Sequence, residues 1–243
     1  MTIARLAMLA VVVAFVLIPR VVWAQAHGGR GWSGTAEVSF VSTSGNSETQ
    51  TVGLAGDLIL SPGPWTTEVK LAFIRSKANN QLNAKSFDMT AQGTRQIDSS
   101  LGVYTKAGYL RDRFAGIDNR YAVEGGVSLN ALTGTHTLTA RGGGGWTQEQ
   151  RAFRDDRNLG TANSSADYIW TLTETSKLQN EATLTLVLRD RDDWRFTNKF
   201  SVSAALSSFF SLKLSHQIGF LNDPVPGFEK TDIKVSAAVV TNF

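Results

Sequence analysis

The sequence predicts an all-β fold, a transmembrane antiparallel up-and-down β-barrel of roughly 12 strands that follows an N-terminal signal peptide. Three observations carry this prediction. Hydrophobic and polar residues alternate along most of the chain, the connections between alternating segments are short and long in turn, and Phe243 ends the sequence in phase with the apolar face of the last segment. A helix requires a period near 3.6, and no segment beyond the signal shows one.

The first residues read as a secretory signal peptide. Residues 1–26 contain a basic residue, Arg5, an apolar stretch over 6–18, and small residues at two cleavage positions. A signal peptide has this order of basic, apolar and small residues. The apolar stretch is shorter than the roughly 20 residues of a spanning helix. We therefore expect cleavage after Ala24 or Ala26.

Residues 27–243 are expected to form the barrel, because alternation continues through them. In the last segment, Ile233 and Val235 alternate with Asp232 and Lys234. In a strand, two such sets point to opposite faces. The expected strands cover residues 31–42, 48–60, 65–76, 85–97, 101–111, 120–130, 135–147, 164–175, 180–189, 195–206, 210–221 and 231–243.

Segment length separates a membrane barrel from a soluble β-sandwich. Membrane barrels use alternating segments of about 10 residues, whereas strands of soluble proteins are usually about 5 or 6 residues long. The expected connections also alternate in length, as periplasmic turns and outer loops do. The short ones are 61–64, 98–100, 131–134, 176–179 and 207–208, and the long ones are 77–84, 112–119, 148–163, 190–194 and 222–230.

Aromatic residues favour the same fold. Barrel precursors commonly end on an aromatic residue that the outer-membrane assembly machinery reads, so Phe243 is predicted to be an assembly signal and that machinery a partner. Tryptophans at or near the ends of expected strands are typical of the aromatic girdles of membrane barrels, although Trp170 lies more centrally in its segment. These residues are Trp32, Trp65, Trp146, Trp170 and Trp194.

Composition excludes several classes of protein. The chain has no cysteine, which excludes disulfides, thiolate metal sites, a cysteine nucleophile and a lipoprotein anchor. The formal net charge is +3, but Arg5 and Arg20 lie in the signal or at its apolar boundary. Without these two of the 24 basic residues, 22 remain against 21 acidic ones. The mature chain is therefore hardly cationic, and nucleic acid is not an expected partner.

Three stretches resemble the DUF481 family, whose members are labelled salt-induced outer membrane proteins. The first is Trp32–Val38 together with Ser44–Thr51, the second is Arg111–Tyr121, and the third is Pro224–Asp232 running into the last segment. The stretches spread over essentially the whole mature chain. The resemblance implies an outer-membrane barrel and a location in the cell outer membrane, and it implies no catalytic residues.

The polar face of the expected strands carries charges of both signs. In a barrel this face lines the lumen, so two interpretations stand beside each other: a narrow, weakly selective pore, or an interior of ion pairs that gives the barrel a structural role in the envelope. The predicted lumen charges are Glu37, Asp57, Glu68, Lys70, Asp88, Lys106, Arg120, Glu124, Arg141, Asp167, Arg189, Lys199, Lys213 and Lys234, with Glu181 and Asp232 on the same face.

The expected outer loops are rich in arginine and aspartate. Arginine pairs bidentately with phosphate, so these arginines are candidates for binding phosphorylated lipopolysaccharide. Pairing among neighbouring loop charges is the alternative, and calcium held by Asp190, Asp192 and Asp193 is another, although a calcium-loop pattern is missing. The candidate arginines are Arg111, Arg113, Arg151, Arg154, Arg157, Arg191 and Arg195.

No residue pattern predicts catalysis, a cofactor or a metal site. A barrel enzyme acting on membrane lipids is an alternative function, but Ser215 and His216 are adjacent and therefore point to opposite faces of a strand. The glycine run 142–145 lacks the lysine and the strand-to-helix context of a phosphate loop. We expect a monomer that contacts outer-membrane lipid and lipopolysaccharide; a soluble periplasmic binding module is the remaining alternative.

Overall fold

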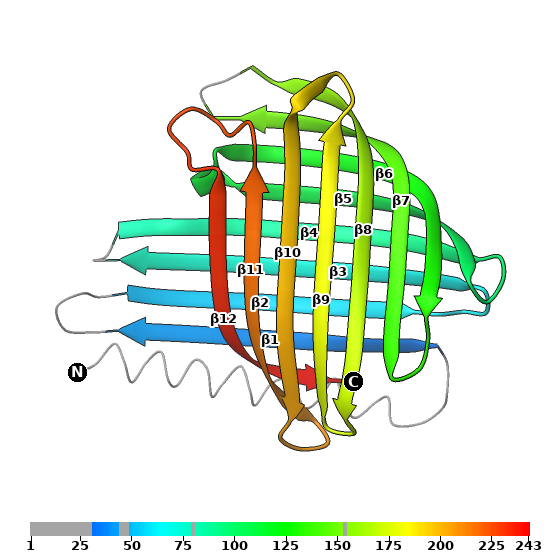
Figure 1. The fold of residues 1–243 in the computed structure, drawn as a ribbon. Coiled ribbons are helices and arrows are strands. Elements are labelled where there is room, and N and C mark those ends of the chain that lie inside the picture. The colour runs from blue at the N-terminus through cyan, green and yellow to red at the C-terminus, as the bar shows by residue number, and fades with distance from the viewer. Residues whose placement is uncertain (1–30, 44–48, 79–80, 153–154) are drawn as a thin grey trace.

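The chain forms a closed antiparallel β-barrel of twelve strands in the computed structural model, which describes residues 31–43, 49–78, 81–152 and 155–243 (Figure 1). Each strand pairs with its neighbours in sequence, and β1 pairs with β12 to close the ring. The predicted fold class and strand number are confirmed. The predicted signal peptide, residues 1–26, lies outside the described residues. Within them, no helix is long and apolar enough to cross a membrane.

The strands are longer than a typical strand of a soluble protein. Their bounds are β1 Trp32–Thr43, β2 Thr49–Leu60, β3 Trp65–Ala78, β4 Gln81–Gln96, β5 Leu101–Asp112, β6 Ile117–Leu132, β7 His136–Arg151, β8 Arg157–Thr173, β9 Ser176–Val187, β10 Asp190–Ala205, β11 Phe210–Leu221 and β12 Thr231–Asn242. A 3-10 turn, η1 Arg113–Ala115, lies between β5 and β6. β1 begins and β12 ends at one end of the barrel, here called the terminal end; the opposite end is the loop end.

The register places apolar and polar side chains on opposite faces of the wall. Asp57 lies opposite Lys70, and Lys106 lies opposite Glu124, on the inner face. Residues of the other phase, such as Leu54, Leu71 and Val123, are exposed on the outer face. Figure 1 shows the front strands running steeply and the rear strands running across the view, as expected for strands that tilt strongly around a barrel.

Several connections that the sequence predicts to be long are strand. Residues 77–84 are almost entirely β3 and β4, and 190–194 begin β10. Of the predicted loop 148–163, only 152–156 lie outside β7 and β8. The reason is that backbone pairing continues where the outward residues are no longer apolar, so the hydrophobic pattern fades before the strand ends. Residues 222–230 remain a long connection at the loop end.

A short turn at the terminal end is fixed by one carboxylate. Asp98 lies between β4 and β5 and accepts hydrogen bonds from the backbone N–H groups of Ser100, at 2.7 Å, and Leu101, at 2.8 Å. These two donors lower the pKa of the Asp98 carboxyl below its usual value. The side chain closes the turn together with backbone hydrogen bonds from the N–H groups of Ile97 and Asp98 to the carbonyl of Leu101.

Aromatic side chains gather near both ends of the barrel. Near the terminal end, His136 stacks on Trp170 with ring centroids 5.3 Å apart, and the guanidinium of Arg95 lies 5.5 Å from the centroid of the Trp65 ring. Near the loop end, aromatic pairs are Phe87 with Tyr109, Tyr109 with Tyr121, and Trp194 with Phe220. Two such belts are typical of membrane barrels, in which they lie at the two interfaces.

The seam between β1 and β12 is the shortest pairing in the ring. Its register runs from Thr35 opposite Asn242 to Val38 opposite Val239, and within the described residues no further pair joins the two strands toward the loop end. Phe243 extends the seam at the terminal end. Its N–H donates to the carbonyl of Gly34 at 3.0 Å, and its carbonyl accepts from the Gly34 N–H at 2.8 Å.

Glycine lets β6 and β7 approach closely. A Cβ at Gly143 would lie 2.4 Å from the carbonyl oxygen of Gly125, and a Cβ at Gly145 would lie 2.3 Å from that of Val123. By contrast, a Cβ at Gly142 would meet no atom within 4 Å. The predicted role of the glycine run 142–145, which is to permit bending or close packing, therefore fits Gly143 and Gly145.

This difference gives a matched pair of substitutions. Gly143→Ala is expected to destabilise the barrel because the added methyl group meets backbone that cannot move without breaking pairing, whereas Gly142→Ala on the same strand leaves stability nearly unchanged. The measurement is the temperature at which each folded barrel loses its faster migration on a gel. Equal midpoints for the two variants would show that close approach of β6 and β7 does not limit stability.

Candidate functional site

The middle of the lumen is crossed by a charged pair. Lys70 Nζ on β3 lies 3.8 Å from Glu181 Oε2 on β9, and 3.2 Å from Glu68 Oε1 on its own strand. β3 and β9 are diametrically opposite in the strand order, so side chains from facing walls meet here. Their side chains nevertheless remain 37% exposed for Lys70 and 31% for Glu181. This level of the lumen is therefore both narrow and accessible to water.

Other lumen charges are paired along or around the wall. Lys106 Nζ lies 3.2 Å from Glu124 Oε1, and Arg141 is paired with Asp167 on the adjacent strand. Longer-range pairs join Lys213 on β11 to Glu37 on β1, and Lys234 on β12 to Asp112 on β5, the latter at 3.6 Å. Because charges of both signs alternate around the interior, most of them have an opposite charge within reach.

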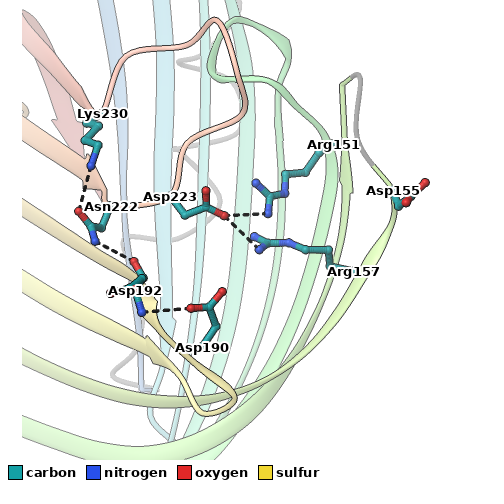
Figure 2. A pocket seen from close by; sticks show the side chains of 8 residues that line it. All are labelled: Arg151, Asp155, Arg157, Asp190, Asp192, Asn222, Asp223 and Lys230. Atoms are coloured by element: carbon teal, nitrogen blue, oxygen red, sulfur yellow. Dashed lines mark hydrogen bonds and ion pairs between the residues drawn. The ribbon is translucent and has the colours of Figure 1, made fainter.

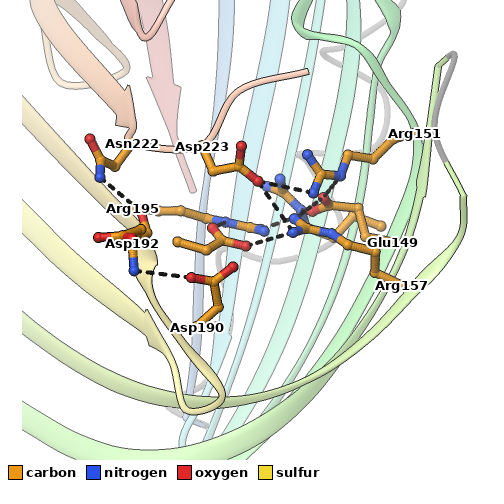
Figure 3. A network of polar contacts seen from close by, with 10 residues as sticks. Glu149, Arg151, Arg157, Asp190, Asp192, Arg195, Asn222 and Asp223 are labelled. Atoms are coloured by element: carbon orange, nitrogen blue, oxygen red, sulfur yellow. Dashed lines mark hydrogen bonds and ion pairs between the residues drawn. The ribbon is translucent and has the colours of Figure 1, made fainter. Parts of the chain in front are cut away.

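A dense ion-pair network lies farther toward the loop end (Figure 3). Its centre is the carboxylate of Glu149 on β7, which is 1% exposed and receives four guanidinium groups. Two arginines reach Oε2, and two reach Oε1. The contacts are Arg120 Nε at 2.6 Å and Arg195 Nη1 at 2.9 Å to Oε2, and Arg151 Nε at 3.0 Å and Arg157 Nη2 at 3.1 Å to Oε1.

Two aspartates complete this network, here called the arginine cluster: Arg120, Arg151, Arg157 and Arg195 with Glu149, Asp193 and Asp223. Asp193 is 1% exposed and lies 2.9 Å from Arg157 and 3.6 Å from Arg195. Asp223 Oδ2 lies 3.5 Å from both Arg151 and Arg157. Four guanidinium groups thus share three carboxylates, and the cluster carries an excess positive charge. Its core is far drier than the middle of the lumen.

The loop between β11 and β12, residues 222–230, folds against the barrel mouth. Val225 of this loop is 2% exposed. It packs with Phe228 against Gly116 after η1, where an added Cβ would lie 2.9 Å from atoms of both side chains. Gly116 has φ +72, a left-handed conformation that favours glycine. Asp223 ties the start of the same loop to the arginine cluster, so loop and cluster close the mouth together.

A cavity of about 730 Å³ lies directly outside the cluster (Figure 2). Arg151, Arg157 and Asp223 form its inner wall, and the rim carries charges of both signs. Asn222 braces the rim by donating from Nδ2 to the backbone carbonyl of Asp192 at 2.8 Å. The remaining lining residues are Asp155, Asp190 and Lys230. The cavity therefore offers a polar vestibule whose floor is buried arginine.

The inner face holds the predicted lumen charges with one exception. The strand registers place Glu37, Asp57, Glu68, Lys70, Asp88, Lys106, Arg120, Glu124, Arg141, Asp167, Lys199, Lys213 and Lys234 on that face. Arg189 instead lies in the exposed β9–β10 turn. That placement corrects the predicted lumen position, and the reason is that β9 ends at Val187, before the alternation suggests.

The candidate lipopolysaccharide-binding arginines divide into two groups. Arg111, Arg113 and Arg191 are exposed at the loop end. The second group lies inside the barrel, in the arginine cluster, and consists of Arg151, Arg157 and Arg195. The prediction that these three residues lie in outer loops is wrong, because β7, β8 and β10 extend through their positions and turn the side chains inward. Arg154 lies outside the described residues.

Sequence reasoning missed Glu149, the centre of the cluster, because it assigned residues 148–163 to a loop. A usable signal was present. The phase of Arg141, Thr147 and Glu149 is the same, and it continues to Arg151. Following the alternation past the last apolar outward residue would have placed Glu149 on the inner face.

Two alternatives from the sequence, catalysis by Ser215 and His216 and calcium binding by the aspartates, find no supporting contacts in the described residues. Ser215 lies opposite Ser201 on the inner face, and His216 lies opposite Phe200 on the outer face, so the two diverge as expected. In the described part of the chain, no group of three or more potential metal ligands comes together. The carboxylate of Asp193, one of the three aspartates considered as calcium ligands, is instead paired with Arg157 and Arg195.

The family model described as a protein of unknown function, DUF481, matches residues 36–243. The chain belongs to the DUF481 family. The resemblance seen in the sequence is thereby confirmed. No curated protein shows a significant sequence match to the chain.

Solved structures of outer-membrane barrels are similar in fold. An outer membrane channel from Pseudomonas putida F1 aligns with a TM-score of 0.54 at 11% identity, covering 90% of this chain and 97% of the other. The translocator domain of the autotransporter NalP from Neisseria meningitidis aligns with a TM-score of 0.50 at 13% identity, covering 96% and 95%. At these identities the similarity concerns the fold alone.

The cluster geometry predicts the effect of removing its central charge. Glu149→Gln leaves four buried guanidinium groups without their shared carboxylate, so we expect a loss of about 3–5 kcal/mol in the free energy of unfolding. Urea titration of the barrel refolded into lipid vesicles measures this loss. The control is Glu229→Gln, an exposed glutamate at the same end. Unfolding midpoints that do not separate Glu149→Gln from Glu229→Gln would contradict a stabilising role for the network.

Proposed function

We propose that this DUF481 protein forms a narrow, weakly selective, water-filled passage for small solutes across the outer membrane, held closed at its loop end. The observation that carries the proposal is the contrast in exposure along the lumen. Lys70 and Glu181 keep about a third of their side-chain surface accessible although they lie inside a closed barrel, whereas Glu149 and Asp193 are 1% exposed. A barrel serving only as a solid structural element would be packed at both levels.

An outer-membrane location and a monomeric state belong to the same proposal. The apolar outer face, the two aromatic belts and the fold shared with an outer membrane channel support the location. A non-enzymatic role is proposed as well, because His216 lies on the outer wall beside Phe200 and away from Ser215.

Closure of the passage is proposed to depend on loop 222–230. Val225 and Phe228 pack against Gly116, and Asp223 contacts the arginines below. Gly116→Ala should therefore displace the loop, because the methyl group meets both side chains and alanine disfavours φ +72. We expect the unitary conductance in planar bilayers to rise several-fold above that of the unaltered protein.

The control for this measurement is Gly63→Ala. Gly63 has φ +64, so the backbone strain is similar, but a Cβ there would meet no atom within 4 Å and the residue is in a terminal-end turn. Its conductance should equal that of the unaltered protein. If neither the unaltered protein nor Gly116→Ala conducts at high salt, the pore is excluded and a structural role in the envelope takes its place.

Two partners are proposed from surface residues. Arg111, Arg113 and Arg191 remain exposed at the loop end, where they are available to phosphates of lipopolysaccharide. Arg113 already pairs with Asp118 at 3.1 Å, but its side chain is 61% exposed. Water screens that pair, so a phosphate can compete for the guanidinium.

Phe243 is proposed to be read by the barrel assembly machinery. Its side chain also packs against β1, since the centroid of the Phe243 ring lies 5.9 Å from that of the Trp32 ring. Phe243→Ala retains the backbone bonds to Gly34 and removes the ring. We expect lower levels of folded barrel in the outer membrane of cells but near-normal folding of the purified chain into detergent. Equal losses in both settings would assign the ring a purely structural role at the seam.

A further inference from the structure

Beyond the passage itself, the arginine cluster has the composition of an anion-binding site. It brings four guanidinium groups to three carboxylates, and the partners come from β6, β7, β8, β10 and the β11–β12 loop. Burial leaves these charges weakly screened by water, so the positive excess acts strongly on anything that enters. Arginine in such a setting recognises phosphate and carboxylate through paired N–H donors.

Unused donors point in the same direction. Arg120 Nη2 and Arg157 Nε are buried, and within the described residues neither has a hydrogen-bond acceptor. Buried guanidinium N–H groups without an acceptor are costly, so an anion that supplies an acceptor is favoured here. Asp193 Oδ2 is a buried acceptor without a hydrogen-bond donor, but its carboxylate is already ion-paired with Arg157 at 2.9 Å. Both side chains are held in place by Glu149, so the unused donors have a fixed position.

Asp223 marks where the ligand group would sit. Its Oδ2 lies between Arg151 and Arg157 at 3.5 Å from each, longer than the roughly 2.7–2.9 Å of a well-made charge-assisted hydrogen bond. Asp223 also lines the cavity of about 730 Å³. A small oxyanion has space to enter from this cavity and replace a carboxylate held at long distance.

The acidic rim does not outweigh the arginines. Asp155, Asp190 and Asp192 are exposed, so water and salt screen them. The side chain of Arg151 is 2% exposed and that of Arg195 is 12% exposed. The field at the cavity floor is therefore set by the buried groups. Because these groups face the lumen, a solute reaches them through the mouth, and a lipid head group in the membrane does not.

We propose that the arginine cluster binds the phosphate or carboxylate group of a small anionic solute, which displaces Asp223 from Arg151 and Arg157. The proposal rests on the proposed passage for its supply of solute, but binding itself requires only the folded barrel. Displacement of Asp223 releases one attachment of loop 222–230, so binding and opening of the mouth are coupled through this residue.

The test uses the full chain folded in detergent and inorganic phosphate as the probe. Calorimetric titration with phosphate is compared with sodium chloride at equal ionic strength. We expect saturable phosphate binding that chloride does not reproduce, and Arg157→Gln should weaken it about tenfold or more, as loss of a charged hydrogen bond does. Arg189→Gln, which changes an exposed arginine of the β9–β10 turn outside the cluster, should bind as the unaltered protein does.

A second variant protects the test against misfolding. Asp223→Asn removes the competing charge from a loop position, so it should bind phosphate several-fold more tightly. Phosphate binding that chloride reproduces, or equal affinities for Asp223→Asn and the unaltered protein, would overturn the proposal. Phosphate binding without any conductance would support the anion site and overturn the proposed passage. Conductance without phosphate binding would support the passage and overturn the anion site.

Discussion

Backbone hydrogen bonding is the constraint on which the structure depends. In an apolar membrane each N–H and C=O group needs a partner within the protein, and a sheet meets this need only by closing on itself. Here eleven hairpin pairings follow the chain, and the ring is completed by one seam between β1 and β12. That seam has a short register and is extended by two bonds between Gly34 and Phe243. Closure at this point creates an inside and an outside.

The interior then has its own electrostatic order. Charges of both signs that face the lumen pair with neighbours on adjacent strands, as Lys106 does with Glu124, or across the barrel, as Lys70 does with Glu181. Pairing is loose and wet in the middle, where ionised groups keep part of their hydration. Toward the loop end it becomes dense and dry around Glu149, where desolvation must be offset by several contacts at once. Closure of the mouth and recognition of an anion would use the same buried arginines.

Much of the fold could be predicted because alternation is a local property. Period two, segment length and phase indicated the barrel, the strand number and the inward face of residues such as Glu37 and Lys213. The ends of strands were predicted poorly. Near the loop end the outward residues become polar, so the hydrophobic alternation ends before the backbone pairing does. For this reason the sequence suggested that Arg151 and Arg157 are loop residues, although they lie on paired strands.

The sequence by itself determined which face of each strand is polar, because adjacent residues in a strand point to opposite sides whatever the strand pairs with. Only the tertiary structure decided which charges meet. Glu149 on β7 and Arg195 on β10 are far apart in the chain and have two strands between them in the wall. Their contact at 2.9 Å depends on barrel curvature and on the register of every pairing between them. Register and closure are properties of the whole ring, so no local pattern specifies them.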